Sequence, residues 1–590
     1  MASTAETRVK RHLIALYGEE QAEQVLPQLQ ERLSRFTQRN PGLQAKARDP
    51  AGLLTERDVF LITYGDQVTE PGRRPLVTLT EVLEKTIAGI VSGIHLLPFF
   101  PYSSDDGFSV IDYTAVNPAL GTWADVEHLG RRFRLMFDAV INHISAESDW
   151  FRAFVDGDPR YARYFITVEP GTDLSDVVRP RARPLLTPVQ TAQGEKLVWT
   201  TFSPDQIDLN YANPDTLLDI IDVLLFYVEK GAEVIRLDAI AYVWKEIGTS
   251  CIHLAEAHQI VKLFRALLDA VAPHVILITE TNVPHEENVS YFGSGRDEAQ
   301  LVYQFPLPPL VLHTFHTGDA THLAEWAAGL STPSSSTTFF NFLASHDGIG
   351  VRPVEGILSP AQVEAMVERT RRHGGHVSYK TNADGSRSVY ELNISYFDAL
   401  SSPTGDEPLR TQVRRFLTSQ AVMLSLAGVP GIYVHSLFGS RSDPEGVQET
   451  GRYRSINREK FQRRDLEHAL ADPTSRRHQV LYAYLDMIRA RTSHPAFHPN
   501  AEQHVVPPEA AGSASLFVLL RTSRTSGQSV LCIHNAALTE QPLRLDLRAL
   551  GIGRPGAFQD LLSPATYSTT GHTLELNVVP YQALWLEAIS

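Results

Sequence analysis

Several apolar segments of this sequence end in polar side chains that can transfer protons, pair with charge or attack carbon. They are Asp138, Asn142 and His143 in one segment, Arg236 and Asp238 in a second, Glu280 in a third, and His346 and Asp347 in a fourth. A single such Asp is most simply explained as a helix cap or a surface group. Burying a carboxylate costs several kcal/mol unless it is paired or hydrogen-bonded. Four segments that end in this way therefore indicate a functional site.

Two of these acids suit glycosyl transfer with retention. One carboxylate attacks the anomeric carbon and a second carboxyl group, about 5–5.5 Å away, protonates the leaving oxygen. Asp238 comes two residues after Arg236, so strand alternation places both side chains on one face. We expect the guanidinium to lower the pKa of Asp238 and keep it ionised as a nucleophile. Glu280 follows the apolar run 276–278, which predicts the raised pKa of a general acid.

Eight short, mostly continuous apolar segments carry these residues. They span 59–65, 92–100, 133–142, 232–242, 274–282, 301–305, 339–347 and 428–435, with helical stretches between them. Continuous apolar runs are typical of strands covered on both faces. Eight such strands alternating with helices predict an α/β fold, a (β/α)8 TIM barrel.

The long connections and the two ends of the chain predict additional parts. Residues 144–205 and 348–427 are too long for plain connections, so we expect inserted subdomains where barrels build active sites. From about residue 500, short apolar strands and turn signals predict an antiparallel β domain. We predict an N-terminal helical extension at 1–50 and a catalytic barrel at 51–143, 206–347 and 428–495. An inserted domain is predicted at 144–205, a second insertion at 348–427 and a C-terminal β domain at 496–590.

Composition excludes several classes of protein. The 590 residues are 43% apolar, which rules out global disorder, and the net charge of −15 argues against a nucleic-acid binder. Two cysteines, Cys251 and Cys532, cannot form a disulfide framework or a cysteine zinc site. The N-terminus lacks the apolar core of a signal peptide, and the run 421–434 is too short to cross a membrane. We expect a cytoplasmic monomer or homodimer with no membrane or nucleic-acid partner.

Four motifs resemble the short sequence regions of the α-amylase superfamily of retaining glycoside enzymes. They are FDAVINH, IRLDAI, ITETN and FLASHD, in this order. The resemblance implies that the nucleophile is Asp238, the acid/base Glu280 and the transition-state stabiliser Asp347. It also implies that three further residues contact the glucosyl ring, namely Arg236, His143 and His346.

The flanking sequence resembles the sucrose phosphorylase group over residues 58–460. The segments that carry this similarity include LLPFFPYSSDDGF, VVRPRARP and TFSPDQIDLNYANP. By that resemblance, Asp105 holds the distal sugar hydroxyls, Phe108 stacks on the sugar ring and Arg454 reaches the same end of the sugar. Gln206 and Tyr242 line the site. Arg181 is implied to bind phosphate, and an Arg-rich loop in an acidic chain agrees with this assignment.

The acceptor side departs from the sucrose-cleaving members. The segment SVYELN places Tyr390 and Glu391 at acceptor-contacting positions, where a Gln is expected instead of the Glu. Upstream lies a basic run, which is either a solvated helix end or an acceptor pocket for an anion: Arg369, Arg371, Arg372, His373, His376 and Lys380. Together with residues 1–50, these features resemble the glucosylglycerate phosphorylase branch, and a branch that handles sucrose 6′-phosphate is also compatible.

These observations predict a retaining disaccharide phosphorylase. It would convert an α-glucoside, best guessed as 2-O-α-glucosyl-D-glycerate, and phosphate to α-D-glucose 1-phosphate and the free acceptor. Phosphate is a co-substrate, and no metal or organic cofactor is expected. The alternatives are a sucrose or sucrose 6′-phosphate phosphorylase, a hydrolase or transglucosidase of the same superfamily, and a non-enzymatic barrel. The last should have lost part of the acidic triad, which this chain retains.

Overall fold

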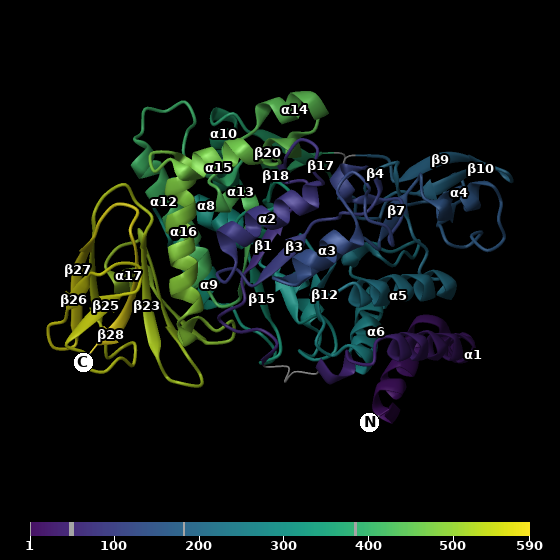
Figure 1. Cartoon of the computed structure of the whole chain (residues 1–590), viewed down its shortest axis with the longest axis horizontal. Helices are drawn as coiled ribbons and strands as arrows, with labels where there is room; N and C mark the ends of the chain where they lie inside the picture. Colours follow the sequence, from purple (N-terminus) through teal and green to yellow (C-terminus); the bar gives the residue numbers. More distant parts are fainter. Residues whose placement is uncertain (1, 47–51, 181–182, 383–385, 590) are drawn as a thin grey trace.

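Eight parallel strands close into a barrel at the centre of the computed structural model, which describes residues 2–46, 52–180, 183–382 and 386–589 (Figure 1). Around the barrel they follow chain order: β1 (Phe60–Thr63), β3 (Gly93–Leu96), β6 (Arg134–Ala139), β12 (Ala232–Leu237), β13 (Ile276–Thr279), β14 (Leu301–Tyr303), β15 (Thr338–Asn341) and β19 (Val429–Tyr433). Strand β19 pairs with β1 and closes the sheet. The predicted (β/α)8 barrel is confirmed.

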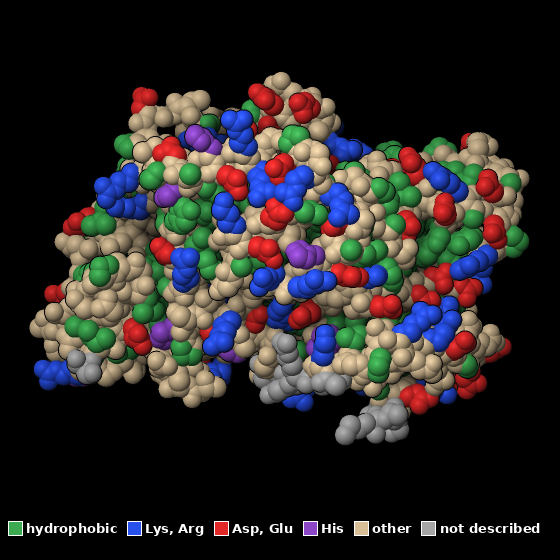
Figure 2. Space-filling model, in the orientation of Figure 1, with side chains coloured by type: hydrophobic (Ala, Val, Ile, Leu, Met, Phe, Trp, Pro, Cys, Tyr) green, Lys and Arg blue, Asp and Glu red, His purple; other side chains and the backbone are tan. Residues whose placement is uncertain are grey.

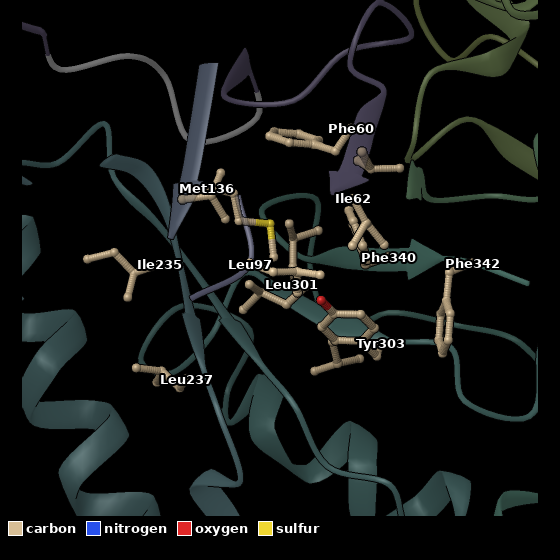
Figure 3. Close-up of a cluster of buried hydrophobic side chains, with 14 of the residues drawn as sticks. Phe60, Ile62, Leu97, Met136, Ile235, Leu237, Leu301, Tyr303, Phe340 and Phe342 are labelled. Carbon is tan, nitrogen blue, oxygen red and sulfur yellow. The ribbon is translucent and has the colours of Figure 1, made fainter. Parts of the chain in front are cut away.

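Large apolar side chains fill the inside of the barrel. Figure 3 shows Ile62, Leu301, Tyr303 and Phe340 gathered together, whereas Ile235 and Leu237 point to the other side of their strand, away from this group. Two glycines make room for the rings, because a Cβ on Gly93 would lie 2.3 Å from the ring of Phe60 and one on Gly431 would lie 2.3 Å from the ring of Phe340. The interior is therefore a packed core, and a substrate can bind only at an end of the barrel.

Helices cover the barrel, as in other proteins of this architecture. They include α2 (Pro75–Ile87), α3 (Trp123–Gly130), α5 (Pro214–Glu229), α6 (Ala255–Val271), α8 (Leu307–Thr317), α12 (Leu409–Ser425) and α16 (Arg476–Thr492). Helix α1 (Ala2–Arg39) bends at Gly18, where φ is 78°. It packs on α6 and α5, with Arg8 Nη1 2.9 Å from Asp269 Oδ2. The first 39 residues therefore add a layer to the outside of the barrel.

Two long connections rise above the barrel. The one after β6 contains β7 (His143–Ser145), α4 (Asp149–Val155), β8 (Thr167–Val168), β9 (Leu186–Thr191), β10 (Gly194–Trp199) and β11 (Gln206–Asp208). The one after β15 contains β16 (Ile349–Gly350), α10 (Pro360–Arg372), β17 (His376–Thr381), β18 (Arg387–Asn393) and α11 (Tyr396–Leu400). Pairing of β11 with β7 and of β16 with β18 returns both connections to the barrel end.

The C-terminal part is antiparallel, as predicted. One sheet has the order β21 (Glu502–Val506), β22 (Leu516–Thr522), β23 (Ser529–Asn535), β28 (Ala583–Ile589), β25 (Ala557–Asp560) and β26 (Thr566–Ser568). Strands β24 (Gln541–Asp546) and β27 (Thr573–Val578) pair separately. Arg521 connects this part to the barrel, because its guanidinium donates to Ser425 O at 2.9 Å and to His498 O at 2.8 Å.

The surface is mixed in charge. Figure 2 shows basic and acidic side chains interspersed over the face that it displays. Among the residues described, no helix is both long enough and apolar enough to span a membrane.

Candidate active site

A small cavity of about 70 Å³ lies at the carboxyl end of the barrel strands. Its walls gather nearly all of the predicted site residues: Asp105, Phe108, His143, Phe202, Gln206, Asp238, Ala239, Glu280, Asn282, His346, Asp347, Tyr390, Glu391 and Arg454. Phe202, Ala239 and Asn282 were not predicted. A larger hollow lies beside the start of β15, at the opposite end of the barrel, and contains none of the predicted residues. The polar cavity is therefore the candidate active site.

Arg236 is the centre of the acidic cluster. Its Nη1 donates to Asp238 Oδ1 at 2.7 Å and to Asp138, and its Nη2 lies 4.0 Å from Glu280 Oε2. The predicted same-face arrangement of Arg236 and Asp238 is confirmed. His95 Nε2 lies 2.6 Å from Asp138 Oδ2. Although burial raises the pKa of Asp138, Arg236 and His95 lower it to about 2, so this carboxylate stays ionised beneath the site.

The pKa of Asp238 runs against our expectation. Burial raises it more than Arg236 lowers it, and the neighbouring Asp138 raises it further. The predicted electrostatic contact is present, but the carboxylate is only 8% exposed and loses most of its hydration. Arg236 therefore limits the rise in the pKa of Asp238 without reversing it.

Glu280 has the properties expected of a general acid. It follows β13 directly, and its Oε2 accepts a hydrogen bond from the backbone N–H of Ala239 at 3.0 Å. Ala239 has a left-handed φ of 47°, an uncommon conformation for a residue with a Cβ. Burial raises the pKa of Glu280 to about 7, with Asp238 and Asp347 adding to the rise and Arg236 opposing it. A carboxyl group with this pKa can both donate and accept a proton at neutral pH.

Asp347 completes the acidic triad from a loop rather than a strand. We predicted that the seventh strand runs to Asp347, but β15 ends at Asn341. Arg454 Nη1 lies 2.6 Å from Asp347 Oδ1, and His346 Nε2 lies 3.5 Å from its Oδ2. Burial raises the pKa of Asp347, but Arg454 and other nearby cations outweigh this effect and hold it well below its usual range. Asp347 is therefore a fixed negative charge.

The opposite wall of the cavity is a polar cluster. Gln206 Nε2 donates to Phe108 O at 3.0 Å and lies 3.2 Å from His143 Nε2 and 3.5 Å from Asp105 Oδ2. His143 Nε2 also lies 2.8 Å from Phe108 O. The ring of Phe108, predicted to stack on the sugar, stacks on the His346 imidazole with centroids 4.6 Å apart. These side chains present a cluster of hydrogen-bonding groups to the cavity.

Glu391 is neutralised within the site. Its side chain is 2% exposed, and both of its carboxylate oxygens accept hydrogen bonds from Arg454, through Nε at 3.1 Å and through Nη2. Because Arg454 also pairs with Asp347, one guanidinium joins two carboxylates that are far apart in the sequence. Tyr390, the neighbour of Glu391, lines the same cavity, as predicted.

None of the residues in the basic run 369–380 lines the cavity. Arg369 donates to His316 O at 3.0 Å, and His373 Nδ1 donates to Asp398 O at 2.6 Å. Lys380 Nζ lies 3.7 Å from Glu355 Oε1. The partners of these three groups lie on α8, on α11 and at Glu355, so the structure does not place them in an acceptor pocket.

Two further predicted residues, Arg236 and Tyr242, do not line this cavity. Tyr242 lies one layer back, with its ring 5.5 Å from that of Phe202. Burial raises the pKa of its hydroxyl, and the nearby Arg352 cation lowers it. Arg181, the predicted phosphate ligand, lies outside the described residues. The flanking Val178 donates its N–H to Ser250 O at 3.0 Å, which places residue 178 beside the loop that follows Tyr242.

Metal-binding groups are a separate question. Within the part of the chain that the structure describes, no cluster of three or more His, Cys, Asp or Glu side chains could hold a metal ion.

Comparison with known proteins identifies the family. Residues 86–348 match the family model of the alpha-amylase catalytic domain. The glucosylglycerate phosphorylase of Allomeiothermus silvanus is 57% identical over 85% of this chain and 88% of that protein, and the glucosylglycerate phosphorylase of Spirochaeta thermophila is 52% identical over 90% of each. The crystal structure of a sucrose 6F-phosphate phosphorylase from Thermoanaerobacter thermosaccharolyticum superposes with a TM-score of 0.70 at 26% identity, over 82% of this chain and 94% of that one. The chain belongs to the alpha-amylase family and, within it, to the group of the glucosylglycerate phosphorylases.

Proposed function

We propose that the protein catalyses the reversible phosphorolysis of 2-O-α-glucosyl-D-glycerate, giving α-D-glucose 1-phosphate and D-glycerate with retention. One observation carries the proposal. Asp238, hydrogen-bonded to Arg236, shares a cavity with Glu280, whose pKa burial raises to about 7, in a chain closely similar to glucosylglycerate phosphorylases. This combination supports both the double displacement and the acceptor.

In the first step, a carboxylate oxygen of Asp238 attacks the anomeric carbon. The bond from that carbon to the glycerate oxygen breaks, and Glu280 gives its proton to the departing oxygen. The product is a β-glucosyl-enzyme and free glycerate. The sugar ring gains positive charge in the transition state, and the ionised carboxylate of Asp347 stabilises it.

In the second step, a phosphate oxygen attacks the same carbon on the face that glycerate left. The bond to Asp238 breaks, and any proton on the attacking oxygen passes to Glu280, which returns to its acid form. Two inversions give net retention, so the product is α-D-glucose 1-phosphate. We propose that Arg181 helps to bind this phosphate, since charge-assisted bidentate contacts favour Arg as a ligand for phosphate.

The remaining wall residues position the sugar. Asp105, His143 and Gln206 form one hydrogen-bonded cluster, which suits the hydroxyl groups of the glucosyl ring. Arg454 holds Asp347 in place from the other side. The phosphorolysis needs only the glucoside and phosphate and releases the acceptor as a product, so we propose that no metal or organic cofactor takes part.

The test is an acceptor and phosphate screen of the purified enzyme. Glucose 1-phosphate is supplied with glycerate, glycerol, fructose or fructose 6-phosphate, and phosphate release is followed. We expect glycerate to be the best acceptor. In the reverse direction, glucose 1-phosphate should form only when phosphate is present. A preference for fructose or fructose 6-phosphate would assign the enzyme to the sucrose or sucrose 6′-phosphate phosphorylases, and phosphate-independent glucose release would make it a hydrolase.

A further inference from the structure

Arg352 differs from the other arginines around the cavity. It is the first residue of a short 3-10 helix (Arg352–Val354) in the connection that follows β15. Arg236, Arg454 and Arg458 each hydrogen-bond to a carboxylate. Arg352 Nη2 lies 3.9 Å from Glu287 Oε2, which is too far for a hydrogen bond.

The guanidinium of Arg352 is also incompletely satisfied. Its side chain is 18% exposed, and its Nε is buried with no hydrogen-bond partner among the residues that the structure describes. A buried donor without a partner costs about 1–3 kcal/mol, so native proteins retain few of them. Glu287 does not compensate, because it is 43% exposed and its Oε2 is closer, at 3.2 Å, to His253 Nε2. Arg352 is therefore a cation with unused donor capacity.

Arg352 lies just behind the cavity wall, and its own side chain is not part of that wall. The backbone N–H of the neighbouring Val351 donates to Tyr390 O at 3.2 Å, and Tyr390 lines the cavity. Burial raises the pKa of the Tyr242 hydroxyl to about 12, while the Arg352 cation lowers it and the Glu280 carboxylate raises it, so both charges lie near that hydroxyl. Two residues before Arg352, a Cβ on Gly350 would lie 2.8 Å from the amide of Asn282, so this loop packs directly against a residue of the cavity wall. The leaving group must lie next to Glu280 to receive its proton, and Arg352 is on that side.

The same wall offers a partner for a hydroxyl group. Asn282 Oδ1 is buried and has no hydrogen-bond partner among the described residues, and Asn282 lines the cavity. An amide oxygen accepts a hydrogen bond from an alcohol, whereas a guanidinium binds an oxyanion. The pair therefore fits a ligand that carries both groups, as a hydroxy acid does.

The order of steps in a double displacement indicates which oxyanions Arg352 would bind. In a double displacement, the leaving acceptor and the incoming phosphate occupy the same side of the anomeric carbon in turn. Under the proposed function, on which this inference rests, both ligands are oxyanions. We propose that Arg352 is the specificity-determining residue that recognises the negative charge on the acceptor side, the carboxylate of glycerate in one half-reaction and phosphate in the other.

The experiment compares charged and neutral acceptors in variants of Arg352. The donor is α-glucosyl fluoride, which releases fluoride and brings no second oxyanion, and the acceptors are glycerate, glycerol and phosphate. For Arg352→Gln, we expect the ratio of kcat/KM for glycerate to kcat/KM for glycerol to fall about 10- to 100-fold, mostly through KM, as expected for a lost charge-assisted contact. Arg352→Lys should recover part of this ratio. Arg132→Gln is the matched control, since Arg132 is 67% exposed and pairs with Glu84 outside the barrel.

The measurements with phosphate as acceptor show whether Arg352 binds glycerate, phosphate or both. A rise in KM for both glycerate and phosphate supports a shared site, and a rise for only one assigns Arg352 to that ligand. Equal losses with glycerate and glycerol, or an unchanged ratio, would overturn the inference and leave Arg352 as a support for Tyr242. If the unmodified enzyme transfers glucose to neither glycerate nor phosphate, the proposed function itself fails, which is a separate result.

Discussion

Replacement of Glu280 by Gln tests the raised pKa on which the mechanism depends. Burial raises the pKa of Glu280 from an ordinary 4.5 to about 7. At pH 7, a carboxyl group with a pKa of 4.5 would be protonated in only about 0.3% of molecules, whereas a pKa of about 7 leaves about half of them protonated. The environment therefore increases the amount of acid form by roughly 150-fold at neutral pH.

The assay compares two substrates that need the acid to different degrees. Glucosylglycerate has a poorly leaving alkoxide and requires proton donation, whereas α-glucosyl fluoride does not. We expect Glu280→Gln to lower kcat/KM for glucosylglycerate by roughly 10²- to 10⁴-fold and to affect the fluoride far less. In the unmodified enzyme, kcat/KM for glucosylglycerate should fall as the pH rises through about 7, because the acid form is lost, and the Gln variant should lack this alkaline decline.

Two results would refute this reasoning. Equal losses on both substrates would show that Glu280 is not the proton donor. An alkaline decline that persists unchanged in Glu280→Gln would assign it to another group. Asp347→Asn tests the same pKa while Glu280 stays in place. Because Asp347 raises the pKa of Glu280, replacing it with the neutral Asn should move the alkaline decline to lower pH.

Three further changes test other parts of the structure. Asp238→Ala should lower turnover by several orders of magnitude in a folded protein, and azide should rescue it with a β-product; near-normal activity would exclude it as the nucleophile. Arg454→Gln should cost about 3–5 kcal/mol of unfolding free energy, because it leaves the buried Glu391 unpaired. Adding Glu391→Gln to this variant should restore stability in urea without restoring kcat, since Asp347 still lacks its cation. If the free-energy costs of the two substitutions simply add, the ion pair between Arg454 and Glu391 does not contribute as proposed. Arg521→Met should cost about 2–4 kcal/mol through the lost hydrogen bonds to Ser425 O and His498 O, as measured by the urea midpoint, whereas the exposed Arg524→Met should cost little.

The barrel could be predicted because its signal is local. Each strand is a continuous apolar run followed by polar residues, and that pattern is visible within about ten positions of the sequence. The same logic placed Asp238 and Glu280 directly after their strands. It failed for His346 and Asp347, because the apolar residues 342–344 continue the run after β15 has ended. Hydrophobicity does not distinguish a buried strand from a buried loop.

The acceptor side could not be predicted because its contacts are not local. The basic run 369–380 suggested an anion pocket, but its charges are used by carbonyls and acids on neighbouring elements. The cation that neutralises Glu391 is Arg454, which lies 63 positions away. Asn282 and Arg352 gave no sequence signal, since a single Asn or Arg in a loop is most often solvated. Only the packing of Gly350 against Asn282 brings them together.

The charges of the cavity explain why loops must take part in binding an anion. Among the described residues, its walls carry five carboxyl groups and a single guanidinium, that of Arg454, which is already shared by Asp347 and Glu391. Burial lowers the pKa of His346 to about 3, so this residue adds no positive charge at neutral pH. Arg236 is occupied by Asp138 and Asp238. Such a site stabilises a positively charged sugar but repels glycerate and phosphate, so the charge that attracts them must come from cations outside the triad. Arg236, Arg454 and Arg458 each hydrogen-bond to a carboxylate, whereas Arg352 Nη2 lies 3.9 Å from Glu287 Oε2, which is why the acceptor charge should depend on Arg352.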